Sequence, residues 1–569
     1  MIVSSRSWIG LMAVATIAGG AVTKVTPGSA AMDVPGLNVG RVTGTVLPIW
    51  NPATTYEGLK RGLVEQEYKV FRFPNGSASN SYHWNGAGSY DSVGIWHPDS
   101  AKVLPGFMSD TRYRGTTKSN YGSIFHSSIT DGADSTFWWS DPWGGDQPWV
   151  MLDFGADSTV DSVRIAWGAL RPDSVVVGTI ANSDWSGYRG IDGVLAPLAR
   201  VAVAESVSLV SFSAKAVRFL VVKPLGVKPQ GVQIAEVSAW KKGVKVTKNL
   251  PSQATQTPVR AMGAHPGSTR QTGWVDGTPP WTFAMFMDYL KAFPNAEAMM
   301  CVNYGTGTPE EAAAWVKYAN VEQKLGIKFW QVGNEMDGNW EEGGPVDARQ
   351  YAVKFLAYAR AMRAVDPSIV ILGPVQAGME FATSASGHLD GTSWTEEVLR
   401  IVGEAEAKDG VRYLDGFDFH AYPYWTATKP TAREALKAMQ GLRNNLDTLD
   451  AMMKRRLKDL GTRLICMSEF NMSVVSMDLL MRHENALGNA SMLSQLVDKF
   501  GGNAMSIAWE SFDGGATGSI ETGGTFGALS LFADPRSGSA SSDRYVPNAP
   551  YWGNWMVSKL WAIPGAKPV

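Results

Sequence analysis

The sequence contains little cysteine: only Cys301 and Cys466 occur among 569 residues. Two cysteines cannot form the dense disulfide network that stabilises many small secreted domains. Both lie in apolar runs that we assign below to the third and seventh strands of a barrel, which stand on opposite sides of it. Because a disulfide requires Cα atoms within about 7 Å, we expect two buried free thiols.

Charge is also scarce. Charged residues make up 18% of the chain, and 51 Lys and Arg against 53 Asp and Glu give a formal net charge of -2. Globular proteins average about 25% charged residues, so the chain offers no cationic excess to a polyanion, and we expect no nucleic-acid partner. The seven histidines show no metal-ligand spacing. We therefore expect neither a metal nor another cofactor.

No segment reaches the roughly 20 apolar residues that span a bilayer. Near the start, Arg6 precedes the apolar stretch Trp8–Val22, and the small residues Ser29, Ala30 and Ala31 follow. This order is typical of a cleaved export signal. We predict a signal peptide over residues 1–31 and a secreted protein, extracellular or periplasmic, with no membrane partner after cleavage. A membrane anchor is the alternative.

What the sequence does contain is a regular alternation of short apolar runs and helical patterns, which is typical of parallel β/α units. Eight such units predict a (β/α)8 TIM barrel. The expected strands are Val42–Trp50, Tyr68–Phe73, Ala296–Tyr304, Lys328–Gly333, Ile369–Pro374, Leu414–Tyr422, Leu464–Phe470 and Ala504–Glu510. Expected helices include Pro309–Tyr318, for which Thr308 is a candidate cap, and Asp347–Val365.

A long interruption separates the second expected strand from the third. There, clusters of Gly, Ser and Asp alternate with strand-like segments such as Val160–Trp167 and Val217–Val222, which indicates an antiparallel β-sandwich. A connection at the mouth of a barrel can hold such an insertion without breaking strand pairing. We predict the signal peptide in residues 1–31, barrel strands 1–2 in 32–89, the inserted sandwich in 90–249, and barrel strands 3–8 in 250–569.

Functional residues of such barrels gather at the C-terminal ends of the strands. Glu335 ends the fourth expected strand and Glu469 the seventh. Hydrolysis of a glycosidic bond requires one group to protonate the leaving oxygen and another to attack the anomeric carbon or activate water. A single strand-end glutamate is more often a solvated charge, but this pair has polar and aromatic companions at other strand ends. These companions are Arg72, His420, Tyr422 and Trp509.

Five segments of the chain carry recognisable motifs: RFPNG at 72–76, YHW at 82–84, VNYGTGTPEEA at 302–312, YAN at 318–320 and GNEMDGNW at 333–340. These segments closely resemble glycoside hydrolase family 51 of clan A. The likeness runs from about residue 42 to the end of the chain, excluding the insertion. It is specific because the segments occur in the order that a clan A barrel requires.

The resemblance implies a role for each matching residue. Glu335 would be the acid/base, Glu469 the nucleophile, and Asn334 a hydrogen-bond partner of the sugar 2-hydroxyl. Three further substrate-binding residues would be Arg72, His420 and Tyr422. A structural ion pair for Arg72 and an indirect supporting role for His420 are the alternatives.

Three features depart from the family. Its arabinofuranosidases have a substrate-binding glutamate at the end of the first strand, where this chain has Leu47-Pro48-Ile49-Trp50. Where the family is expected to have an asparagine after the glycines that follow the second strand, this chain has Ser77. The family's C-terminal sandwich is not expected either, since Val569 follows soon after the eighth expected helix. The mechanism that the resemblance implies is unaffected by these departures, but they leave the identity of the sugar in the substrate open.

The insertion has motifs of its own: DG at 131–132, TFW at 136–138, Trp149 before LDFG at 152–155, RF at 218–219 and IAEV at 234–237. They resemble those of discoidin-type sandwiches, a fold shared by many carbohydrate-binding modules. Trp138 and Trp149 match core positions. Trp139, Trp143 and Trp185 are possible sugar-binding residues, since flat indole faces suit sugar rings.

Together these patterns predict a secreted retaining glycoside hydrolase that acts on polysaccharides or oligosaccharides. The alternatives are an α-L-arabinofuranosidase acting on terminal arabinose and a non-catalytic carbohydrate-binding protein on a degenerate barrel. Loss of either strand-end glutamate would indicate the binding protein, but both are present.

Overall fold

The computed structural model describes residues 44–46, 57–84 apart from 75, short strands between 88 and 119, 129–140, 148–180, 195–247 apart from 229, and 283–561 with gaps. The longest of these gaps are 382–392, 512–530 and 534–545. The predicted signal peptide, Trp143 and Trp185 lie outside the described residues.

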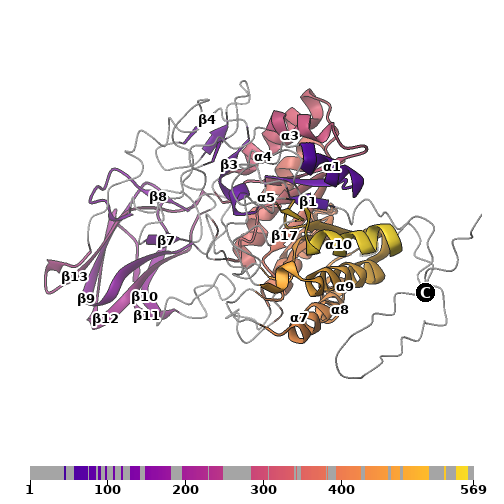
Figure 1. The fold of residues 1–569 in the computed structure, drawn as a ribbon. Coiled ribbons are helices and arrows are strands. Elements are labelled where there is room, and N and C mark those ends of the chain that lie inside the picture. The colour runs from indigo at the N-terminus through magenta and orange to yellow at the C-terminus, as the bar shows by residue number, and fades with distance from the viewer. Residues whose placement is uncertain are drawn as a thin grey trace, which may run out of the picture.

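Eight parallel strands form a closed barrel, and their order around it is their order in the chain. The barrel strands β1 and β17 are labelled among the surrounding helices in Figure 1. They are β1 (Gly44–Val46), β2 (Val70–Phe73), β15 (Glu297–Val302), β16 (Phe329–Val332), β17 (Val370–Gln376), β18 (Gly416–Ala421), β19 (Leu464–Phe470) and β20 (Ala504–Ala508). Each overlaps one predicted strand. The predicted (β/α)8 barrel is confirmed.

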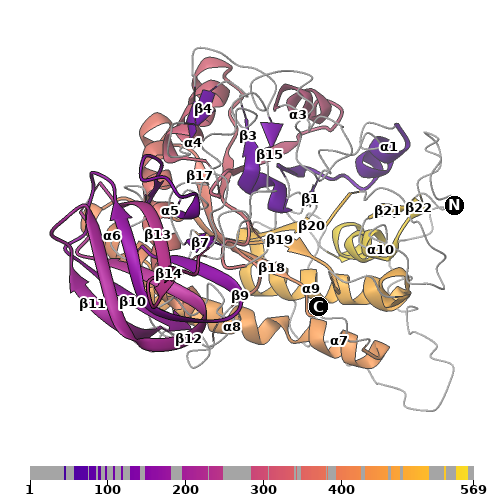
Figure 2. The ribbon, with the colours of Figure 1, turned by 90° about the vertical axis from the view of Figure 1, so that its left-hand side faces the viewer.

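Helices follow the barrel strands and surround the barrel (Figure 2). They are α1 (Glu57–Glu65), α3 (Phe283–Leu290), α4 (Pro309–Val316), α5 (Ala348–Val365), α6 (Trp394–Asp409), α7 (Ala432–Gln440), α8 (Leu442–Arg456), α9 (His483–Phe500) and α10 (Ala549–Trp555). The predicted cap of α4 is confirmed, because the Thr308 side chain accepts a hydrogen bond from the Glu311 N–H. This helix is shorter than expected, since a π-helical turn, Lys317–Glu322, replaces its predicted end.

Side chains alternate between the two faces of each barrel strand, as the two-residue period of a strand requires. In β2, Phe71 and Phe73 pack outward in the large core shared with the helices, whereas Val70 packs in a small cluster inside the barrel. The same alternation directs the buried Arg72 into the barrel above Val70. Polar groups can thus be placed inside the barrel at the ends of strands whose other face is apolar.

The barrel is closed by residues from the two ends of the described chain. Strand β1 pairs with β20 through Gly44 and Ile507. A Cβ atom on Gly44 would lie 2.5 Å from the Ser506 carbonyl oxygen, so only glycine permits this approach. Outside the barrel, the Asn554 side chain of α10 donates a hydrogen bond to the Tyr68 hydroxyl, 2.7 Å away.

The insertion forms a separate antiparallel sheet, seen beside the barrel in Figures 1 and 2. Its central strands are β9 (Val150–Trp167) and β12 (Val207–Leu225). Strand β9 begins earlier than the predicted segment and ends with it at Trp167, whereas β12 extends the other predicted segment in both directions. The others are β7 (Thr117–Ser119), β8 (Trp138–Trp139), β10 (Ser174–Ile180), β11 (Ala196–Ala202), β13 (Gln233–Lys241) and β14 (Val244–Lys245). The pairing of β9 with β12 shifts register twice, and such shifts bend strands. A two-layer sandwich of discoidin type stays a prediction.

Two shorter hairpin-like pairs lie between β2 and this sheet in the sequence. Strand β3 (Tyr82–His83) pairs with β6 (Phe107–Met108), and β4 (Gly88–Tyr90) pairs with β5 (Trp96–Pro98). Strand β3 belongs to the YHW motif that follows the second barrel strand. The chain therefore comes back to this motif at β6 before it enters the inserted sheet.

The inserted sheet has its own hydrophobic core. Every buried residue of its two apolar clusters lies between Ile129 and Ala239, and neither cluster includes a residue of the barrel. Trp138 and Trp149 are buried in these clusters, as their predicted core positions require.

Residues 90–249 produced as a separate protein are expected to fold cooperatively, because their apolar core is self-contained. Thermal unfolding followed by near-ultraviolet circular dichroism would give a single sigmoidal transition. A broad transition without fixed tertiary signal would show that the sheet depends on the barrel.

The two cysteines are buried free thiols, as expected. They lie on β15 and β19, on opposite sides of the barrel. In the part of the chain that the structure describes, no helix has the length and apolar character needed to cross a membrane.

Candidate active site

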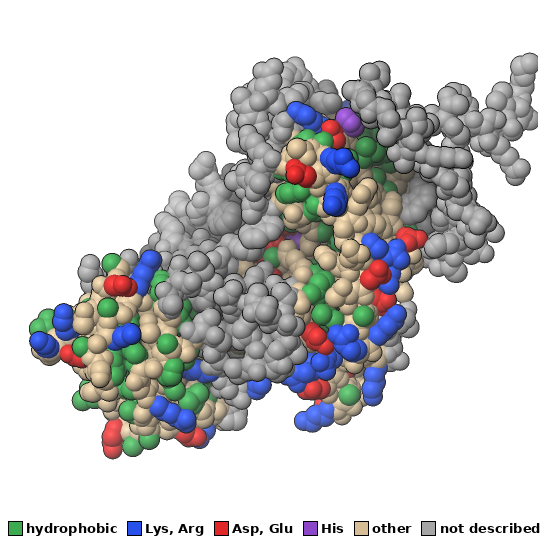
Figure 3. Space-filling view, turned by 90° about the horizontal axis from the view of Figure 1, so that it is seen from below, with side chains coloured by type: hydrophobic (Ala, Val, Ile, Leu, Met, Phe, Trp, Pro, Cys, Tyr) green, Lys and Arg blue, Asp and Glu red, His purple; other side chains and the backbone are tan. Residues whose placement is uncertain are grey.

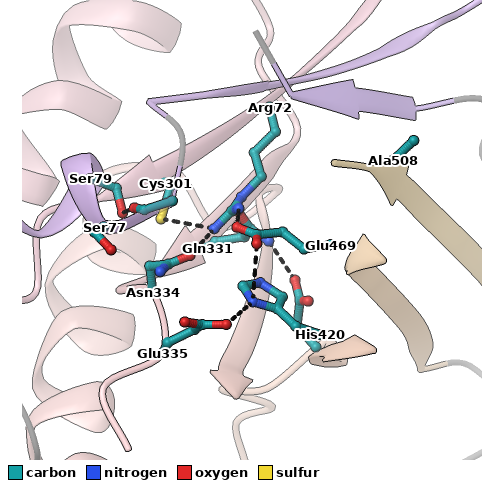
Figure 4. Close-up of polar contacts among 12 residues, drawn as sticks. Arg72, Ser77, Ser79, Cys301, Gln331, Asn334, Glu335, His420, Glu469 and Ala508 are labelled. Atoms are coloured by element: carbon teal, nitrogen blue, oxygen red, sulfur yellow. Dashed lines mark hydrogen bonds and ion pairs between the residues drawn. The ribbon is translucent and has the colours of Figure 1, made fainter. Parts of the chain in front are cut away.

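The structure brings the predicted catalytic residues together at one end of the barrel (Figure 4). Glu335 follows β16, and Glu469 is the penultimate residue of β19. One oxygen of each carboxylate and a ring nitrogen of His420 all lie within 4.8 Å of one another. Glu335 is partly exposed, whereas Glu469 is buried. Two carboxylates of different exposure thus share one site.

Arg72 is the centre of the buried network beneath these carboxylates. Its Nη1 donates to Glu469 Oε1 at 2.6 Å, and its Nη2 donates to Asn334 Oδ1 at 2.7 Å. Its Nε donates to Gln331 Oε1, also at 2.6 Å, and Gln331 in turn donates to Asp418. The rigid guanidinium fork fixes both the carboxylate and the amide in position. Arg72 therefore forms an ion pair that is part of the site.

Glu469 has both oxygens engaged. Arg72 holds Oε1, and the Tyr422 hydroxyl donates to Oε2 at 3.0 Å. Burial raises the pKa of the Glu469 carboxyl; His420 and Arg72 oppose that rise and Glu335 adds to it, leaving the pKa above its usual value. The contacts aim an ionised Glu469 toward the mouth with little rotational freedom.

Glu335 is in contact with His420. The distance from His420 Nδ1 to Glu335 Oε1 is 2.6 Å, and to Glu469 Oε2 it is 3.5 Å. Burial lowers the pKa of His420, but the two carboxylates outweigh this and leave the pKa above its usual value. Either an N–H of His420 donates to ionised Glu335, or protonated Glu335 donates to the neutral ring. Glu335 and His420 can therefore share a proton, which is a more direct role than the supporting one considered from sequence.

The backbone at Glu335 is strained. Its φ is 45°, and its N–H donates at 2.8 Å to the carbonyl of Val375, whose φ is 55°. Positive φ is uncommon outside glycine and is rarer still for a β-branched residue such as valine. Strain of this kind is maintained only where the surroundings enforce it, and it clusters at functional sites. The conformation turns the Glu335 side chain into the mouth directly after β16.

Trp509 closes another side of the site, directly after β20. A Cβ atom on Gly76 would lie 2.8 Å from the Trp509 ring and 3.9 Å from Glu469 Oε1, and the φ of Gly76 is 46°. The segment after β2 can therefore pack against the indole only with glycine at this position. All the predicted residues from the barrel thus lie at one site: Arg72, Asn334, Glu335, His420, Tyr422, Glu469 and Trp509.

Sequence reasoning missed several residues of the network. Gln331 and Asp418 lie inside the barrel on β16 and β18, and their signal was a polar residue in an apolar strand. Asn80 and Glu341 also belong to the site, since Asn80 Nδ2 donates at 2.7 Å both to the Asn334 carbonyl and to Glu341 Oε2. Asn80 lies in a short 3-10 helix, Gly76–Ser81, and Glu341 lies in an irregular segment after β16. In neither place does the sequence carry a signal of spatial proximity.

Glu335, His420 and Glu469 have the spacing of a possible metal site. Their ligand atoms already have protein partners, however: Arg72 and Tyr422 bind the two oxygens of Glu469, and His420 binds Glu335. A cation would have to compete with the guanidinium beside it. The arrangement fits acid–base and nucleophilic chemistry better.

In the insertion, Trp139 is the one candidate sugar-binding tryptophan that can be placed. It is half-buried, and its indole N–H donates to the Gln230 carbonyl at 2.8 Å. That bond fixes one edge of the ring.

Away from the site, the described surface mixes basic and acidic side chains, without a large field of one sign on the face shown in Figure 3.

The raised pKa of Glu469 predicts a pH dependence. Only ionised Glu469 can attack, so activity should be present above its pKa and be lost as the pH falls through it. In a plot of kcat/KM against pH, we expect the midpoint of the acidic limb to lie at a pH above about 4.3, the usual pKa of glutamate. Tyr422→Phe, which removes a hydrogen bond to the ionised form, should move the limb to higher pH. A limb at or below 4.3, or a downward movement in the variant, would contradict this assignment.

Comparisons with known proteins point to glycoside hydrolases. A family model described as glycoside hydrolase family 44 matches residues 302–424. Two relatives are each 28% identical: a probable α-L-arabinofuranosidase C of Aspergillus clavatus over 197 residues, and an exo-α-(1->6)-L-arabinofuranosidase of Bifidobacterium longum over 207. These matches cover 31% and 32% of this chain, and 36% of each relative.

Among solved structures, a family 51 α-L-arabinofuranosidase of Bifidobacterium longum is 15% identical with a TM-score of 0.37. It covers 50% of this chain, which covers 56% of it. The matches to the two arabinofuranosidase sequences span only about a third of the length of those relatives. The predicted resemblance to glycoside hydrolases is supported. Membership of family 51 in particular, and the discoidin type of the insertion, stay predictions.

Proposed function

We propose that this protein is a retaining glycoside hydrolase, with Glu469 as the nucleophile and Glu335 as the acid/base. The observation that carries the proposal is the approach of the two carboxylates to within 4.8 Å between their nearest ligand atoms, at the ends of two parallel strands. Carboxyl groups about 5–5.5 Å apart are typical of retaining enzymes, whereas inverting enzymes need about 6.5–9.5 Å to admit a water molecule.

In the first step, Glu469 attacks the anomeric carbon while protonated Glu335 donates its proton to the departing glycosidic oxygen. The bond from the anomeric carbon to the leaving oxygen breaks, and an ester bond to Glu469 forms. Arg72 and Tyr422 hold the attacking carboxylate in place. Because these contacts exist before the substrate binds, little reorganisation is needed at the moment of reaction.

In the second step, Glu335, now ionised, takes a proton from water, which attacks the anomeric carbon and releases Glu469. The two inversions give net retention of configuration. Between these steps Glu335 has given its proton to the leaving oxygen, and an N–H of His420, 2.6 Å away, can donate a hydrogen bond to the ionised carboxylate. His420 would therefore help Glu335 to change from acid to base.

For the substrate, we propose a polymeric or oligomeric glycan. The segment after the first strand, Leu47-Pro48-Ile49-Trp50, has no acid to bind a terminal arabinofuranose in the manner of family 51. Terminal α-L-arabinofuranose is the second candidate, favoured by the names of both sequence relatives. A secreted location, with cleavage after Ala31, and sugar binding by the insertion are further parts of this proposal.

The test is a panel of plant and microbial polysaccharides, together with aryl glycosides that include an α-L-arabinofuranoside. Product sizes are read by chromatography, and proton NMR identifies the first-formed anomer. Polymer cleavage with retained configuration is expected. Product of inverted configuration would overturn the assigned mechanism. Efficient release of arabinose from the aryl arabinofuranoside, with no activity on the polysaccharides, would make terminal arabinofuranose the first candidate substrate.

A further inference from the structure

The backbone of Asn334 is held by a single side chain, that of Asn80. The Asn334 N–H donates to Asn80 Oδ1 at 3.3 Å, and the Asn334 carbonyl accepts from Asn80 Nδ2 at 2.7 Å. Asn334 is buried and directly precedes Glu335. Its main chain is thus fixed from the segment that follows β2.

The side-chain amide of Asn334 is held in one orientation. Arg72 can only donate hydrogen bonds, so the amide oxygen must face its Nη2, 2.7 Å away. The Nδ2 group then faces Glu341 and donates to its Oε1 at 3.1 Å. Nδ2 has two hydrogens, and only the one toward Glu341 has a partner in the described part of the chain. The second is left for a ligand.

Glu341 is a third carboxylate at the site, and the catalytic steps do not use it. It is buried, and besides Asn334 it accepts hydrogen bonds from Ser77 and Asn80, each at 2.7 Å (Ser77 is drawn in Figure 4). Burial and the nearby Glu335 raise the pKa of the Glu341 carboxyl well above its usual value. A buried carboxylate beside two others opposes folding unless its hydrogen bonds compensate. Two of its three donors, Ser77 and Asn80, come from the segment after β2, and the third is the Asn334 amide itself.

We propose that Glu341 is a positioning residue, which orients the Asn334 amide so that its second N–H meets a sugar hydroxyl next to the anomeric carbon. The inference rests on the proposed hydrolase function and deepens it. Ser77, which stands where family 51 is expected to have asparagine, is then explained: its hydroxyl holds Glu341 rather than the sugar. Recognition of that hydroxyl would depend on a carboxylate that never touches the substrate.

The test compares the best aryl glycoside of the panel with its 2-deoxy analogue. Glu341→Ala should lower kcat/KM on the parent glycoside by about 10- to 100-fold, the range seen when groups that orient an active-site ligand are removed. On the 2-deoxy analogue, which lacks the hydroxyl, the same substitution should have almost no effect. A double variant, Asn334→Ala with Glu341→Ala, should be no slower than Asn334→Ala alone, because the two residues act as one unit.

Equal loss on both substrates would overturn the proposal, since it would mean that Glu341 only maintains the fold. An unchanged parent rate would overturn it as well. If Glu341→Ala does not fold, Glu341→Gln keeps the side-chain volume and carries the same comparison. Glu205→Ala, at an exposed position in the bend between β11 and β12, is the matched control. Failure of the proposed function is distinguishable, because the unmodified protein would then hydrolyse neither glycoside.

Discussion

Replacing Glu469 by alanine is expected to abolish turnover on every glycoside that the protein hydrolyses, with kcat falling on the order of 10⁴-fold or more. Among the residues that the structure describes, no other carboxylate is held by both Arg72 and Tyr422, so none of them is placed to form the covalent intermediate instead. The measurement is initial rate over the whole substrate panel. Because the nucleophile acts on the sugar itself, the loss should not depend on the leaving group.

Added azide gives the second part of this test. A small anion can occupy the space left by the side chain, attack the anomeric carbon in one step and yield a glycosyl azide of inverted configuration. Removing one partner of a buried ion pair also destabilises a protein. Glu469→Gln, which still accepts from Arg72, therefore serves as the control for folding. Appreciable activity in either variant without azide would mean that Glu469 is not the nucleophile.

Replacing Glu335 by alanine is expected to give a loss that depends on the leaving group. General acid catalysis contributes about 10²- to 10⁴-fold, so natural glycans should be hydrolysed more slowly by that amount. Aryl glycosides whose phenolate leaves without protonation should still form the intermediate at nearly the normal rate. A burst of phenol followed by slow turnover would show that only the second step is impaired.

Azide distinguishes Glu335 from Glu469. In Glu335→Ala it attacks the covalent intermediate from the side normally used by water, so the product is a glycosyl azide of retained configuration. Glu205→Ala, with full activity, controls for the handling of variants. Equal slowing of natural and activated substrates would contradict the role of Glu335 as acid/base.

The barrel and most of the site could be predicted from sequence because one physical rule determines both. A strand buried on its outer face reads as an apolar run, and the point where that run ends in Glu335 or Glu469 is the mouth of the barrel. The same rule could have identified Gln331 and Asp418, whose polar side chains interrupt strands and face the barrel interior. Strand ends alone do not reveal them, because both residues lie within their strands.

Glu341 and Asn80 could not have been found in this way. They are 261 positions apart in the chain, and what joins them to Asn334 is the geometry of two connecting segments. A connecting segment has no periodicity that predicts where a side chain points. The strained backbone of Glu335 was equally invisible, since its positive φ depends on the contact with Val375 from the neighbouring strand.

The pairing of β1 with β20 has a consequence for how the molecule is made. Gly44 finds its partner Ile507 only after all the other barrel strands have been synthesised, and α10 follows later still. Contacts this distant in sequence form late in folding. The inserted sheet, whose core is complete by residue 239, can fold while most of the barrel is still unmade. The nascent chain would thus complete the inserted domain first, and the barrel that holds Arg72, Glu335 and Glu469 together would close only after β20 has been made.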